Sequence, residues 1–320
     1  MRLRPLYAAV LLVLVAGCGA STERKPVPRP PGYIAFAVNR GEFNEIWRMQ
    51  PDGSSRRRLT ESAPPDRFGH GSQYPARSLS GQLIAYTSAH EIWRMRADGS
   101  GKKRLTFNRE RDLEPAWSPD GTRIAYVHAA AAAAYAIDVM SADGSGQHEL
   151  ARVVPERGAV YLLTPAWSPD GTRIVYTRYA FANRTDISIY VMSSDGSGRT
   201  RLIPQATEPS WSPRGDRIAF VSDRDHNGRC RPLLFNCPAS AGELYVANAD
   251  GSDQKRLTTT RADERDPTWS PDGARIAFAR AVDATTGYDI YTVRPDGSDL
   301  RRLTREPSVA WDYQPSWGSG

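Results

Sequence analysis

One stretch of the chain has the residue types and spacing of a calcium-ligand set. The string "DRDHNG" places Asp223, Asp225 and Asn227 at alternate positions before a glycine that permits a sharp turn. This matches the opening of a D-x-[DN]-x-[DN]-G calcium loop, in which side-chain oxygens converge on one cation. The twelfth position is Leu234, where an EF-hand has a bidentate Glu, and two arginines lie within the loop. Two interpretations follow: a calcium site, or a polar insertion held by a disulfide.

Catalytic signatures are absent from the rest of the sequence. It contains no G-x-S-x-G nucleophile turn and no H-E-x-x-H zinc motif. The five histidines share no spacing, and we expect solvated loop side chains at all of them: His70, His90, His128, His148 and His226. These observations predict a protein that is not an enzyme and that has no cofactor, apart from the calcium considered above.

A heptad repeat organises the elements that would position any site. The string "PAWSPDG" occurs twice, and related heptads recur along the chain. The six copies start at Pro75, Pro115, Pro165, Pro209, Pro267 and, truncated, Pro315. Each full copy precedes an apolar stretch such as "RIAYVH", a second apolar stretch that ends in Asp-Gly, and a short basic run such as "KKRLT". Such self-similarity is typical of repeat architectures.

Each unit has the pattern of four β-strands. Ser-Pro-Asp-Gly is turn chemistry, and the later Asp-Gly is a hairpin signal between β-rich runs. The middle strands, such as Ile124 to Val127, are apolar at successive residues. Because successive side chains point to opposite faces of a sheet, both faces must be covered. Four-stranded sheets covered on both faces and repeated along the chain predict an all-β fold, a β-propeller.

The two ends of the repeat region predict how the ring closes. The first unit, Gly32 to Thr60, lacks the Pro-x-Trp strand, whereas the chain ends with "YQPSWGSG", a Pro-x-Trp strand with nothing after it. The fragments complete each other, so we predict a single six-bladed propeller over 32–320, with the C-terminal strand completing the N-terminal blade. Tryptophans should fill the wedges between blades. The second blade has Arg77 at that position, which the repeat does not explain.

One position of the repeat gathers polar side chains at the propeller axis. The residue before the inner-strand proline is Tyr74, Glu114, Thr164, Glu208, Asp266 or Gln314 in the six units. Equivalent positions in a closed ring face one another, so three acids and three neutral polar groups would surround one opening. Acids gathered in this way could receive a basic peptide segment or a cation. The alternative is that they hydrogen-bond neighbouring strand ends.

The repeat units resemble those of the TolB-type, WD40-like propeller family. The pattern "PxWSPDGxxIAF…IYxxxxDGxxxxRLT" covers nearly everything from Gly32 to Gly320. The resemblance implies a role in the cell envelope, such as contact with a peptidoglycan-associated lipoprotein. TolB proteins place a small domain before the propeller, where this sequence has a proline-rich stretch.

The N-terminus has the layout of an export signal. Two arginines precede the apolar run "LYAAVLLVLVA", and "LVAGC" resembles the lipobox of bacterial lipoproteins. We therefore predict a signal peptide over 1–17, lipid attachment at Cys18 and an extended tether over 18–31. A plain signal peptide or a membrane anchor is the alternative. Either reading places the propeller outside the cytoplasm, in the periplasm or at the cell surface. Because this route is oxidising, Cys230 and Cys237 should form a disulfide.

The charge distribution limits the class of partner. The chain carries 42 Lys and Arg against 36 Asp and Glu, for a net charge of +6, and the basic residues are scattered through the repeats. We therefore expect no nucleic-acid binding. The leading hypothesis is a monomeric, lipid-anchored module that binds an envelope protein or peptide. The alternatives are an enzyme acting on glycans or peptides at the axis, or a structural module or sensor ectodomain.

Overall fold

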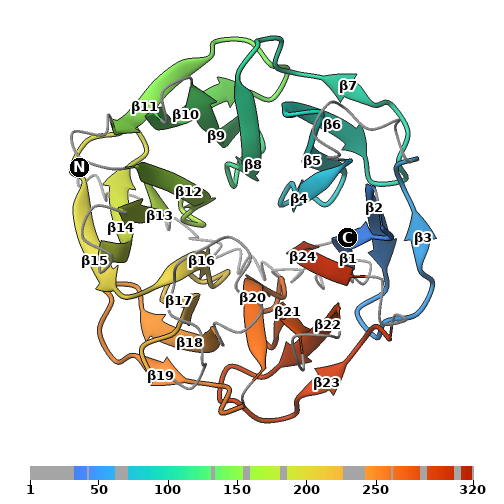
Figure 1. Ribbon diagram of the computed structural model, residues 1–320, viewed down its shortest axis with the longest axis vertical. Coiled ribbons are helices and arrows are strands. Elements are labelled where there is room, and N and C mark those ends of the chain that lie inside the picture. Colours follow the sequence, from blue (N-terminus) through green and yellow to red (C-terminus); the bar gives the residue numbers. More distant parts are fainter. Residues whose placement is uncertain are drawn as a thin grey trace, which may run out of the picture.

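The computed structural model forms a ring of six antiparallel sheets, each of four strands (Figure 1). It describes residues 32–318 except 42, 62–70, 131–133, 154–158, 181–185, 226–241, 261, 282–286 and 306–310. The predicted all-β, six-bladed β-propeller is confirmed. In this part of the chain, no helix is long and apolar enough to cross a membrane.

Each blade runs from an inner strand at the axis to an outer strand at the rim (Figure 1). In blade 1 the order is β24 (Trp311–Gly318), β1 (Tyr33–Asn39), β2 (Asn44–Met49), β3 (Arg57–Arg58). In blades 2 and 3 it is β4 (Gln73–Arg77), β5 (Leu83–Ser88), β6 (Glu91–Arg96), β7 (Lys103–Arg104), and β8 (Arg111–Trp117), β9 (Arg123–Ala130), β10 (Ala134–Ser141), β11 (His148–Val153). In blades 4 and 5 it is β12 (Val160–Trp167), β13 (Arg173–Ala180), β14 (Asp186–Ser193), β15 (Thr200–Pro204), and β16 (Thr207–Trp211), β17 (Arg217–Ser222), β18 (Glu243–Asn248), β19 (Lys255–Arg256). Blade 6 contains β20 (Asp263–Trp269), β21 (Ile276–Ala281), β22 (Tyr288–Val293) and β23 (Arg301–Arg302).

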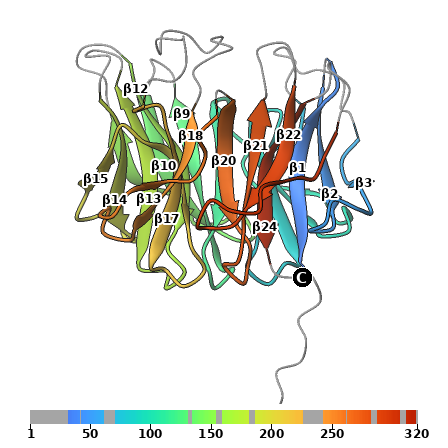
Figure 2. The ribbon, with the colours of Figure 1, turned by 90° about the horizontal axis from the view of Figure 1, so that it is seen from below.

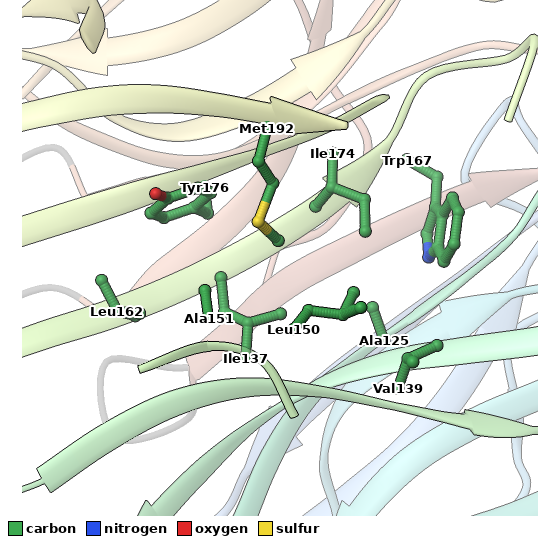
Figure 3. Packing of buried hydrophobic residues seen from close by; sticks show 10 residues of the cluster. All are labelled: Ala125, Ile137, Val139, Leu150, Ala151, Leu162, Trp167, Ile174, Tyr176 and Met192. Atoms are coloured by element: carbon green, nitrogen blue, oxygen red, sulfur yellow. The ribbon is translucent and has the colours of Figure 1, made fainter. Parts of the chain in front are cut away.

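The apolar core lies between neighbouring blades. The second strand of each blade has four or more successive buried residues, as the unbroken apolar runs predicted. Between blades 3 and 4, Ile137 and Leu150 pack with Trp167, Ile174 and Met192 (Figure 3). Radial stacking of sheets therefore buries both faces of each blade.

The Asp-Gly hairpins let the blades approach closely. Gly196 has a φ of 84°, and a Cβ at this position would lie 2.3 Å from the carbonyl oxygen of Leu150 in the preceding blade. Only glycine combines this backbone conformation with this approach. The Asp-Gly of the repeat thus serves inter-blade packing as well as turn formation.

The repeat tryptophans fill the wedges between blades. Trp117 is 7% exposed and Trp269 is 6% exposed. Their indole N–H groups donate to the carbonyl oxygens of Ala76 and Ser210, respectively, on the preceding inner strands, each at 3.1 Å. The rings of Trp117 and Trp269 therefore each join two blades by packing and by a hydrogen bond.

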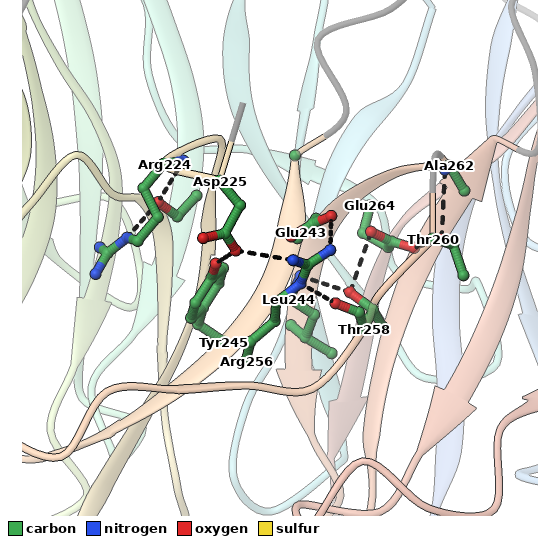
Figure 4. Close-up of polar contacts among 12 residues, drawn as sticks. Arg224, Asp225, Glu243, Leu244, Tyr245, Arg256, Thr258, Thr260, Ala262 and Glu264 are labelled. Carbon is green, nitrogen blue, oxygen red and sulfur yellow. Dashed lines mark hydrogen bonds and ion pairs between the residues drawn. The ribbon is translucent and has the colours of Figure 1, made fainter. Parts of the chain in front are cut away.

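In four blades, the arginine and the threonine of the basic "RLT" run bond to the third strand of the blade. In blade 5, Arg256 pairs with Glu243, and the Thr258 hydroxyl accepts the backbone N–H of Leu244 at 2.9 Å (Figure 4). Equivalent acid, arginine and threonine sets occur in blades 1, 2 and 6. The run therefore supplies a buried acid with its counter-charge.

The ring closes between the two ends of the described chain. Strand β24 pairs antiparallel with β1, with Tyr33 opposite Gly318 and Asn39 opposite Trp311. Figure 2 shows the start of β1 and the end of β24 at one face. The predicted closure, in which the C-terminal strand completes the N-terminal blade, is confirmed.

The contacts of Arg77 explain why blade 2 has an arginine at the tryptophan position of the repeat. Its Nη1 donates to the carbonyl oxygens of Tyr33 at 2.7 Å and Gly318 at 2.6 Å, and its Nη2 donates to Gly81 O at 3.1 Å. The guanidinium also lies 3.3 Å from the centroid of the Tyr33 ring, and Arg77 is 8% exposed. Where the other blades use a tryptophan, blade 2 uses an arginine that joins both strands of the closure.

Candidate functional site

An axial cavity of about 350 Å³ runs along the inner strands. Its rim is formed by prolines of the turns that follow the inner strands, namely Pro119, Pro169, Pro213 and Pro271. We call the side of the propeller that carries these turns the turn face. The six polar positions predicted from the repeat all line this cavity, and we call them the axial ring: Tyr74, Glu114, Thr164, Glu208, Asp266 and Gln314. They lie at its inner end, because no lining residue precedes them on any inner strand.

A β-bulge places each axial-ring residue. All six have φ values between 51° and 54°, a left-handed conformation that is uncommon outside glycine. A register shift occurs at this point of each inner strand, and the next residue is a proline that cannot donate to the ladder. Bulges re-aim side chains. Six identical bulges therefore turn these six side chains toward one another, whatever their type.

Hydrogen bonds connect the axial ring from blade to blade. Gln314 Oε1 accepts the Tyr74 N–H at 2.8 Å, Glu208 Oε2 accepts the Asp266 N–H at 2.7 Å, and Asp266 Oδ2 accepts the Gln314 N–H at 3.2 Å. Glu114 likewise accepts the Thr164 N–H. Each of these four side chains thus holds the backbone of the following blade. The observed contacts of the three acids are those of the alternative, in which they hydrogen-bond neighbouring strands. Ligand binding by the ring stays a prediction.

Burial makes the three ring acids hard to ionise. Burial raises the pKa of Glu114 to about 7, and the negative charge of Glu208 adds to this effect. The pKa of Glu208 is raised by burial, against the lowering effect of Arg265. The pKa of Asp266 is raised well above its usual range by burial and by the charge of Glu208. The floor of the cavity therefore has acids that a cationic group would help to ionise.

The walls of the axial cavity differ from its floor. Between ring and rim they consist mainly of the prolines, alanines, serines and tryptophans of the repeat, with Arg77 and Leu79 from blade 2. No histidine or cysteine is among the described residues that line the cavity. The lining serines are used in turns: Ser118 Oγ accepts the N–H of Arg123 at 2.9 Å. A cavity with this lining can hold an extended segment along its walls and a basic tip at its floor.

Two of the three calcium ligands predicted from "DRDHNG", Asp223 and Asp225, lie within the described residues, and they have different neighbours. Asp225 lies 3.0 Å from Arg256 and accepts the Tyr245 hydroxyl (Figure 4). Asp223 lines a different cavity from the axial one. Asn227 lies outside the described residues, as do Cys18, Cys230 and Cys237, so the calcium, lipid and disulfide predictions stay predictions. Within the described ranges, no cluster of three or more His, Cys, Asp or Glu side chains could hold a metal.

His128 is not a solvated loop residue, and that prediction was wrong for it. It lies on β9 with its side chain 15% exposed, Nδ1 2.7 Å from Asp112 Oδ1 and Nε2 2.7 Å from Glu110 Oε2. The hydrogen bond to Asp112 raises the pKa of His128 to about 9. Asp112 lies on the neighbouring inner strand β8, and Glu110 immediately precedes that strand. Repeat spacing does not identify such a pair, because only blade 3 has it.

Comparisons with curated proteins find partial sequence similarity. No protein-family model matches the chain. It is 32% identical over 93 residues to an uncharacterized peptidase, YuxL, of Bacillus subtilis, covering 29% of this chain and 12% of the relative. It is 34% identical over 126 residues to the Tol-Pal system protein TolB of Anaeromyxobacter dehalogenans, covering 38% of this chain and 25% of the relative. The matches thus span a quarter or less of these two curated relatives.

A solved structure extends the likeness to the whole propeller. The crystal structure of TolB from Acinetobacter baumannii superposes with a TM-score of 0.69 at 18% identity, covering 90% of this chain and 66% of that one. At this identity the superposition shows the fold alone. In fold, the chain is a TolB-like six-bladed propeller.

Proposed function

We propose that this TolB-like propeller is an extracytoplasmic binding module that takes a segment of an envelope protein or peptide into the axial cavity. The observation that carries the proposal is the axial cavity itself, whose walls are rich in proline and tryptophan above three acids whose pKa values are raised. A basic side chain at the tip of a segment would be drawn to this floor. The sequence match to TolB supports a protein partner, with a peptidoglycan-associated lipoprotein as one candidate.

The position of the chain start gives the proposal an orientation. Tyr33, the first residue of β1, pairs with Gly318 at the turn face, and its hydroxyl donates to Gly81 O at 3.1 Å. A tether over 18–31 that joins the propeller here, lipidated at Cys18, would hold the open end of the axial cavity toward the membrane. The partner segment would then approach from the membrane side.

Photo-crosslinking in cells tests the proposal with a matched pair of sites. Leu79 lines the axial cavity and is 52% exposed, whereas Leu300 is 45% exposed and lies outside it. A photoreactive residue at Leu79 should give a discrete protein adduct that the same residue at Leu300 does not give. Equal adducts from both sites, or none from either, would contradict binding in the cavity.

A second candidate function is turnover of glycans or peptides at the axis. The similarity to the uncharacterized peptidase favours it, although the match covers 12% of that relative. Turnover of envelope peptides that is lost in Glu208→Gln, with the fold retained, would support this candidate over binding alone.

A further inference from the structure

A second cavity lies off the axis between blades 4, 5 and 6. We call it the side cavity; its volume is about 190 Å³. It opens near the first residues of β16 and β20 and the last residue of β17, at the end of the blades opposite to the turn face. Its polar lining comes from all three blades and includes Gln205, Glu208, Ser222, Asp223, Asp263 and Arg265. The volume is below the roughly 300–1,000 Å³ of pockets for drug-sized ligands, so the side cavity suits a small molecule.

Arg265 lines the side cavity and forms an ion pair with Asp263 through Nε. Its Nε donates to Asp263 Oδ2 at 2.7 Å and to the Tyr288 hydroxyl at 3.0 Å, which fixes the plane of the group. Its Nη1 lies 4.0 Å from Glu208 Oε1, beyond hydrogen-bond distance, and the side chain is 42% exposed. In the described part of the chain, neither Nη atom donates a hydrogen bond to the protein. Two parallel N–H donors in this geometry match a carboxylate.

Asp223 supplies the opposite charge in the same cavity. Its carboxylate forms no ion pair with Arg265 and no hydrogen bond, as far as the described residues extend, and the side chain is half-buried. Beside it, Ser222 Oγ donates to the carbonyl oxygen of Gln205. The side cavity therefore holds Arg265, which is ion-paired with Asp263 through Nε, and a second carboxylate, Asp223, that is not paired with Arg265.

We propose that the side cavity binds a free α-amino acid as its zwitterion. The ligand carboxylate would accept from the Nη edge of Arg265, and the ligand ammonium would donate to Asp223. A simple anion is disfavoured because Glu208, Asp223 and Asp263 also line the space, and a simple cation would give the Nη atoms of Arg265 no acceptor. A ligand with both charges satisfies both groups. This site does not depend on the function proposed for the axial cavity.

Calorimetric titration of the whole mature protein tests the inference directly. The probes are L-leucine, L-alanine and L-glutamine, together with 3-methylbutylamine and 4-methylpentanoate, which are leucine without its carboxylate and without its ammonium. We expect at least one amino acid to bind at a single site. Both single-charge analogues should bind at least roughly tenfold more weakly than leucine, which is the loss of affinity expected for one charge-assisted contact.

Two variants and a matched control locate the site. Asp223→Asn and Arg265→Lys should each weaken amino-acid binding by roughly tenfold. The first removes a negative charge, and the second replaces the paired N–H donors of a guanidinium with an ammonium group. Asp253→Asn removes an exposed carboxylate of the same blade outside the side cavity and should bind like the wild type. Asp223 forms no hydrogen bond or ion pair within the described residues, so its variant remains informative if the Arg265 variant unfolds.

Three results would each overturn the inference. They are the absence of binding by every amino acid at millimolar concentration, equal binding by Asp223→Asn and the wild type, and binding of the amine or the acid analogue as tight as that of leucine.

Discussion

Replacement of Arg77 by alanine should open the ring at its closure. The change removes three hydrogen bonds from a charged donor and leaves the carbonyl oxygens of Tyr33, Gly318 and Gly81 buried without this partner. Two of these carbonyls belong to the paired strands β1 and β24. The loss therefore falls on the contact between the two ends of the chain.

The magnitude follows from the contacts. A buried hydrogen bond to a charged group contributes about 1.5–3 kcal/mol, and a desolvated cation–π contact such as that with Tyr33 adds about 1–2 kcal/mol. These contributions overlap, because one guanidinium makes all of them. We expect the free energy of unfolding to fall by about 3–5 kcal/mol, at the upper end of single substitutions.

Urea denaturation followed by tryptophan fluorescence measures this change, and hydrogen exchange locates it. Exchange should accelerate first in β1 and β24. Arg48→Ala is a matched control: Arg48 also lies over the Tyr33 ring, at 5.5 Å, but among the described residues its one hydrogen bond goes to Ala97 O and not to either strand of the closure. A loss below about 1 kcal/mol for Arg77→Ala, or a loss equal to that of Arg48→Ala, would refute the closure role.

Four further predictions concern pH, closure and the cysteines. Burial raises the pKa of Glu114 to about 7 from 4.5, so its contribution to stability is complete below pH 4.5 and is lost as pH rises through 7. From pH 5 to pH 8 the wild type should lose about 1–3 kcal/mol more of its unfolding free energy than Glu114→Gln, and parallel curves would contradict this. Ending the chain before β24 (311–318) should abolish cooperative unfolding, and a melting temperature near that of the wild type would exclude closure by this strand. Cys230 and Cys237 should resist alkylation until reduced, whereas rapid labelling of native protein would disprove the disulfide. Mass spectrometry should find a mature chain that starts at acylated Cys18, and an intact N-terminus would rule out the lipoprotein.

Much of the fold could be predicted because its signals are local. Each Ser-Pro-Asp-Gly turn, apolar strand and Asp-Gly hairpin is encoded within a few residues, and six copies repeat the same instruction. The incomplete units at the two ends predicted the pairing of β24 with β1 for the same reason. The axial ring followed from symmetry, since equivalent positions in a closed ring must meet.

The partners of polar side chains could not be predicted in this way. Whether Glu208 binds a ligand or the next blade depends on the N–H of Asp266, which is 58 positions away. The environment of His128 depends on two acids that only one blade carries. Repeat logic describes what the blades share, and these contacts are what they do not share.

The sequence by itself determined the number of blades, the strands within each blade, the closing strand and the six residues at the axis. Those features depend on backbone periodicity, turn chemistry and apolar patterning, all of which act over short distances along the chain. Only the tertiary structure decided that Arg77 joins both ends of the ring, that the axial ring lies at the inner end of a cavity, and that Asp223 and Arg265 face one space. Each of these depends on where curvature of the ring brings separate blades together, because side-chain contacts at a few ångströms are set by packing and not by spacing in the chain.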